Sequence, residues 1–132
     1  MTSPENEVYT RLKAAILAQS PNANTASLYV HSPPSFPHVS IELSDTSDFI
    51  QAMSSADEAM DEVMFTINIY SNLSTGKQAE CRNILRAIDA EMYQMNFTRM
   101  SAIPVPNMQD ATIYRLTARY RAVTDGTYFY RR

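Results

Sequence analysis

The sequence contains few of the residues that build chemical sites. Its 132 residues include one cysteine, two histidines and two glycines. Cys81 has no second cysteine with which to form an internal disulfide bond, which fits a reducing compartment. Gly76 and Gly126 are too few for a glycine-rich phosphate loop. The stretch "STGKQ" at 74–78 lacks the upstream glycine of a P-loop and the Ser or Thr that follows its lysine. We therefore expect no nucleotide site.

The histidines and carboxylates show no metal-binding pattern. His31 and His38 have no second ligand at helical spacing, and both lie near prolines, so we expect surface or edge-strand side chains. Asp45 and Asp48 are close in sequence but lack the glycine and the terminal glutamate of a calcium loop. Cys81 lies on an apolar helix stripe, where a free cysteine behaves as a small hydrophobic residue. We expect no cofactor, no metal ion and no enzymatic activity.

Long hydrophobic runs are also missing. No window approaches the ~18 apolar residues of a membrane span, and "MTSPENEV" at the start lacks the basic and apolar regions of a secretory signal. We therefore expect no membrane partner and a protein that stays where it is made. The composition, 45% hydrophobic and 19% charged, is that of an ordinary globular protein, and the length predicts a single domain over 1–132.

The charges are distributed unevenly along the chain. The net charge is −3 and the sequence pI is about 5.3, which argues against a protein dedicated to coating nucleic acid. From Glu42 to Glu62 there are seven acidic residues and no basic one, whereas five of the eleven Lys and Arg residues lie from Arg115 to Arg132. One part of the chain is acidic and another is basic.

Hydrophobic periodicity predicts an α+β fold with a mostly antiparallel sheet covered by two helices on one face. The first helix is predicted at 4–19 and the second begins after Ser74 as its N-cap, with an apolar stripe from Cys81 to Met95. Strands are predicted at 28–30, 38–43, 62–71, 97–103 and 111–124, with a last short one at 127–130.

The segment 44–61 has no sustained period, and we expect a long acidic loop or arm there, with a short helix near 49–53 as the one alternative. Its side chains are mainly Ser, Asp, Thr and Ala, with Phe49, Met53 and Met60 scattered among them. Loose apolar residues on a polar loop are a common means of gripping a partner.

The stretch "IYRLTARYRAV" at 113–123 has two distinct faces. Tyr114, Leu116, Ala118, Tyr120 and Ala122 form an apolar face, and the other face carries Arg115, Arg119 and Arg121. These arginines could contact phosphates or an anionic substrate, pair with acidic neighbours on an open sheet face, or dock on a protein. Exposed pairs contribute only ~0.2–1 kcal/mol each, and on the arginine face of the strand no aromatic residue lies between the arginines to stack on bases. A basic strand and an acidic arm that are far apart in one subunit can meet head to tail between neighbours, which closes rings.

Four stretches of the sequence together resemble the tail terminator and tail completion proteins of long-tailed bacteriophages. They are "EVYTRLKAAIL", "VMFTINIYSN", "STGKQAECRNILRAIDAEM" and "NMQDATIYRLTARYRAV", the last after a Pro-x-Pro turn. The resemblance extends from about Glu7 to Tyr130 and is most specific at 110–123. It implies an α+β subunit that forms a ring, usually a hexamer, on the head-proximal end of the tail tube. Such a ring stops tube growth and joins the tail to the head connector, without catalysis.

The expected location is therefore the head–tail junction of a virion assembled in the bacterial cytoplasm, with DNA at most passing through the ring lumen. The resemblance transfers a contact role to the region of Arg115 and Arg119. The charge pattern adds Arg121, Asp45, Asp48, Asp57 and Glu58 as candidate contact residues, and the loose apolar residues of the arm add Phe49 and Met53. Two alternatives remain at this point: a head-closure or other connector-ring protein, and a nucleic-acid-binding protein that uses the arginine face.

Overall fold

The structure is a computed structural model that describes residues 4–27, 33, 35–48, 60–106, 112–125 and 128–130. Two helices and six strands follow one another along these residues. They are α1 (Pro4–Gln19), β1 (Asn24–Ala26), β2 (His38–Asp48), β3 (Asp61–Ser71), α2 (Lys77–Gln94), β4 (Thr98–Pro104), β5 (Tyr114–Thr124) and β6 (Phe129–Tyr130).

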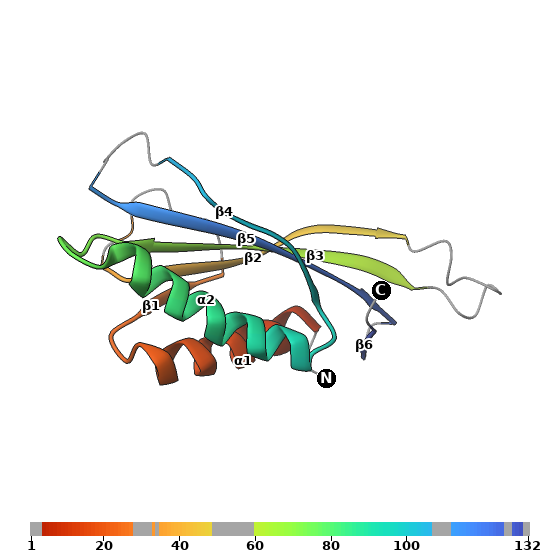
Figure 1. Ribbon diagram of the computed structural model, residues 1–132. Coiled ribbons are helices and arrows are strands. Elements are labelled where there is room, and N and C mark those ends of the chain that lie inside the picture. The colour runs from red at the N-terminus through yellow and green to blue at the C-terminus, as the bar shows by residue number, and fades with distance from the viewer. Residues whose placement is uncertain are drawn as a thin grey trace.

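All six strands belong to one sheet, in the order β1-β2-β3-β5-β4, with β6 paired to β5. Every pairing is antiparallel except that of β1 with β2. Both helices lie on the same side of this sheet (Figure 1). The predicted α+β fold, a mostly antiparallel sheet with two helices on one face, is confirmed.

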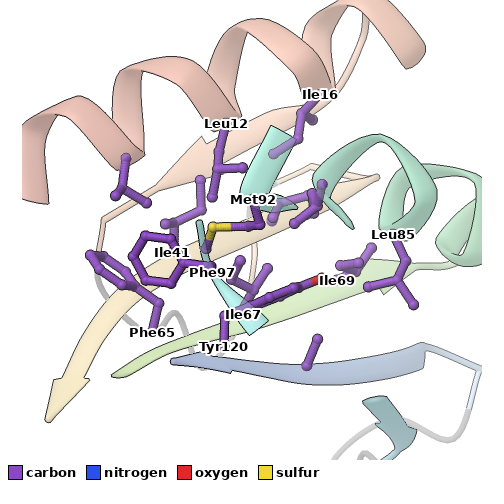
Figure 2. Packing of buried hydrophobic residues seen from close by; sticks show 14 of the residues in the cluster. Leu12, Ile16, Ile41, Phe65, Ile67, Ile69, Leu85, Met92, Phe97 and Tyr120 are labelled. Carbon is purple, nitrogen blue, oxygen red and sulfur yellow. The ribbon is translucent and has the colours of Figure 1, made fainter. Parts of the chain in front are cut away.

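The core lies between the helices and the sheet because each element has one apolar face. Val8, Leu12 and Ile16 recur every four residues on α1, and all three are fully buried. On the sheet, alternate residues of β3 and β5 point to the helices, and Ile67 pairs with Ala118 at the centre. Figure 2 shows labelled side chains from both helices and from β2, β3 and β5 meeting in this layer.

The two ends of segment 44–61 differ from the predicted long loop. β2 continues to Asp48 and β3 begins at Asp61, so residues 44–48 are a strand that pairs with β3. A β-bulge between Leu43 and Asp45 admits the extra residue. Ser44 Oγ donates to the Met64 carbonyl at 3.0 Å. Pairing with β3 overrides the weak strand propensity of this polar sequence. Residues 49–59, including the alternative helix at 49–53, lie outside the described part.

Three smaller expectations also change. Ser74 is not the N-cap of α2: the cap is Gly76, with φ 84° in the left-handed region and no side-chain cap hydrogen bond. The predicted strand at 28–30 lies outside the described residues, and β1, which the sequence analysis missed, pairs with β2 instead. His38 is not a surface or edge residue, because β2 lies between β1 and β3 and His38 is 1% exposed.

Candidate contact surfaces

Arg115 is held within the chain. Its Nε donates to Asn68 Oδ1 at 3.0 Å, and its guanidinium lies over the Tyr70 ring at 5.8 Å from the centroid. Thr117 Oγ1 donates to the same Asn68 oxygen at 2.7 Å, while Asn68 Nδ2 donates to Ser40 Oγ at 3.3 Å. These polar side chains cross β2, β3 and β5 on the sheet face opposite the helices. Arg115 therefore belongs to an internal hydrogen-bond network.

Arg121 brings the basic strand and the acidic segment together within one subunit. Its NH1 lies 3.3 Å from Glu62 Oε1, and the two side chains are 24% and 20% exposed. The pairing register explains the contact, because Met64 is opposite Arg121 and Glu62 is two residues away on the same face of β3. The two charged regions are thus neighbours at this end of the sheet.

Arg119 differs from the other two arginines of the row. It is exposed and lies opposite Thr66 on β3 and Ser101 on β4, both without charge. Among the residues that the structure describes, no ion pair or hydrogen bond engages its guanidinium. Arg119 is therefore the arginine of the row that is available to a partner.

The acidic candidates lie on the long hairpin formed by β2 and β3. Asp45 is exposed and opposite Met64, and Asp61 is exposed at the start of β3. Asp48 is the last residue of β2, where its backbone pairs with Asp61. The candidates Phe49, Met53, Asp57 and Glu58 lie outside the described residues. The hairpin strands run past the C-terminal end of α2 (Figure 1).

The opposite edge of the sheet carries exposed apolar side chains that the sequence analysis did not single out. β4 pairs with β5 alone, so its outer edge has no partner strand in the described part of the chain. Met100 and Ile103 on β4 are 46% and 51% exposed. β6 continues this edge beyond β4 and exposes Tyr130, with Tyr128 just before it. Exposed apolar residues along a sheet edge are candidates for contact with a partner.

A groove lies between α2 and the β4 side of the sheet, with a volume of about 410 Å³. Leu85, Ala102 and Leu116 contribute apolar lining, and Arg82, Arg86 and Arg99 contribute positive charge. Asp89 is the acidic residue of the lining: it accepts hydrogen bonds from the Tyr120 hydroxyl and from Arg99 NH1, the latter at 2.7 Å. The sequence analysis did not anticipate this groove.

The buried titratable groups show no sign of chemical activation. Burial, with a smaller contribution from the nearby Glu80 carboxylate, raises the pKa of the Cys81 thiol to about 12, so the reactive thiolate is disfavoured. Burial lowers the pKa of His38, whose ring nitrogens have no hydrogen-bond partner among the residues that the structure describes. Within the described ranges, no three His, Cys, Asp or Glu residues are grouped to hold a metal ion. No helix in the same residues is long and apolar enough to cross a membrane.

Comparison with known proteins gives a structural likeness and no sequence match. No protein-family model matches the chain, and no curated protein matches it in sequence. Among solved structures, a chain from the virion of a native gene transfer agent particle has a similar fold, with a TM-score of 0.70 and 16% sequence identity. The match covers 92% of this chain and 93% of that chain. At this identity the comparison shows that the two chains share a fold over nearly their full lengths.

Proposed function

We propose that this chain is a structural virion protein that assembles into a ring on the head-proximal end of a tail tube. The ring ends tube growth and joins the tail to the head connector. The observation that carries the proposal is the fold shared with a virion chain over 92% of this protein. The sequence resemblance to tail terminators supports the proposal independently, because it depends on four stretches of the amino-acid sequence and not on the fold. The role needs no catalytic group.

The arrangement of surfaces suits a head-to-tail ring. The acidic hairpin of β2 and β3 and the apolar edge of β4 and β6 lie on opposite sides of β5. The two surfaces differ in chemistry, so contact between them joins unlike patches of successive subunits. Such a heterologous contact produces a ring when its rotation closes. A hexamer, as the resemblance implies, is the ring we propose.

The contact residues follow from what remains accessible. Arg119 is the arginine of the row that we assign to a neighbouring subunit or tail protein, since Arg115 and Arg121 are held internally. On the hairpin we assign Asp45 and Asp48, together with the sequence candidates Phe49, Met53, Asp57 and Glu58. The engagement of two arginines also leaves little of the row for a nucleic-acid backbone, which needs several uncompensated cations.

Tube growth in the presence of the protein tests the proposed function. Tubes polymerised from the tail tube subunit of the same genome are measured by electron microscopy with and without the purified chain. We expect growth to stop at one end of each tube, and Arg119→Glu to weaken the effect. Lys13→Glu, which makes the same charge change on an exposed residue of α1, serves as the matched control.

Unchanged tube lengths and no protein at tube ends would refute the terminator function. Binding to purified connector rings without binding to tube ends would identify a head-closure protein instead.

A further inference from the structure

The groove between α2 and β4 carries more positive charge than the described residues of the chain compensate. Three arginines and one aspartate line it, and Asp89 is already engaged by Arg99 and Tyr120. Arg82 and Arg86 are exposed one helical turn apart, and neither forms an ion pair among the described residues. Like charges at this spacing disfavour the helix. Nothing in the described fold uses the pair.

The chemistry of the groove defines its occupant. Buried Leu85 and Leu116, with half-buried Ala102 and Tyr114, give it an apolar floor beneath the arginines. Its volume of about 410 Å³ accommodates side chains of a peptide segment. An extended segment with both apolar and acidic residues fits such a site, with the apolar side chains on the floor and the carboxylates at the arginines.

This chain contains a segment of that chemistry, residues 49–59 between β2 and β3. It holds Phe49, Ile50 and Met53 together with Asp57 and Glu58, and it has no basic residue. The strands that present it add exposed Asp45 and Asp61. Its charge is opposite to that of the groove.

Within one subunit, even an extended backbone does not carry Met53 as far as Ala102. Asp48 pairs with Asp61, which pairs in turn with Thr124 on β5, whereas Ala102 in the groove pairs with Ala118 on β5. Six residues along β5 span about 20 Å and three strand spacings about 14 Å, which places Ala102 about 25 Å from Asp48. Met53 follows Asp48 by five residues and lies within about 18 Å of it even in a fully extended chain.

We propose that the groove between α2 and β4 receives the 49–59 segment of a second copy of this chain. The proposal rests on the proposed ring and specifies its subunit contact: the hairpin of one subunit enters the groove of the next. Arg82 and Arg86 bind the carboxylates of the incoming segment, and the apolar floor takes its hydrophobic side chains. The contact joins unlike surfaces, so it propagates around a ring.

Thiol cross-linking of the full-length protein tests this contact. Met53→Cys and Ala102→Cys are combined in one chain and treated with a short bismaleimide. Cys81 does not interfere, because it is fully buried. We expect a ladder of covalent multimers on a denaturing gel. The matched control combines Met53→Cys with Lys13→Cys, an exposed site on α1; we expect it to give dimers through Met53→Cys alone.

Charge reversal distinguishes a specific contact from random collision. Adding Asp57→Lys and Glu58→Lys to the cross-linking pair should abolish the ladder, and further adding Arg82→Glu and Arg86→Glu should restore it. A ladder as strong in the control, or one insensitive to these changes, would overturn the proposal, as would its absence from the parent pair.

Two outcomes separate this proposal from the terminator function. Capped tubes without a ladder would refute the contact and leave the function standing, and loss of capping in Arg82→Glu with Arg86→Glu would then assign the groove to a tail protein. A charge-dependent ladder without an effect on tubes would confirm the contact and contradict the function.

Discussion

The hydroxyl of Tyr120 links the core to the surface of α2, and its removal has a predictable cost. Tyr120 is buried under α2, and its hydroxyl donates to Asp89 Oδ1, while Arg99 holds the other carboxylate oxygen at 2.7 Å. Hydrogen bonds to a charged group contribute about 1.5–3 kcal/mol. The Asp89 side chain is 35% exposed, so water partly replaces the lost donor. We therefore expect Tyr120→Phe to lower the free energy of unfolding by about 1.5 kcal/mol, at the low end of that range.

A double-mutant cycle with Asp89→Ala isolates this hydrogen bond. The free energy of unfolding is measured by urea titration for the parent, Tyr120→Phe, Asp89→Ala and the double variant. With Asp89 removed, Tyr120→Phe should cost less than about 0.5 kcal/mol, because the partner is gone. In thermal unfolding the single change should lower Tm by about 6 °C for a domain of this size. An equal cost of Tyr120→Phe in both backgrounds would show that the hydroxyl acts elsewhere.

Three further predictions concern other buried positions. Burial lowers the pKa of His38 in the folded chain below 6.5, so the unfolded chain takes up a proton at a higher pH than the folded chain does. The free energy of unfolding, measured by denaturant titration, should therefore fall as the pH drops below about 6.5. His38→Leu should flatten this pH dependence. Ile67→Ala in the fully buried centre of β3 should cost about 2–5 kcal/mol, whereas Ile103→Ala on the exposed edge should cost less than about 0.5 kcal/mol, and similar values for both would contradict the assigned core. Cys81, with its pKa raised to about 12, should react with a thiol reagent only on unfolding, and rapid labelling of the native protein would show that it is accessible.

Periodicity identified the core because it reports which side chains share a face. The stripe on α2 was predicted from spacing alone, and Cys81, Ile84, Leu85, Ile88 and Met92 are all buried there. The alternation in 113–123 likewise identified the buried face of β5, where Leu116, Ala118, Tyr120 and Ala122 face the helices. These predictions depend only on local geometry, which the sequence carries directly.

Contacts between distant segments were beyond such local patterns. The strand at 44–48 forms because β3 pairs with it, although its residues have weak strand propensity. The pair of Arg121 with Glu62 depends on the register of β3 with β5, which no pattern in either segment reveals. The groove lies between α2 and β4, and no pattern within either segment shows that the two lie side by side. A charged segment therefore indicates a surface, while its partner depends on topology.

The location of the protein in the virion tests the central claim most directly. A tagged version of the chain is incorporated into virions, and the tag is labelled with gold and located by electron microscopy. The account predicts label at the head–tail junction, at the head-proximal end of the tube. Label at the tail tip, along the tube, on the capsid shell or nowhere in the particle would contradict it.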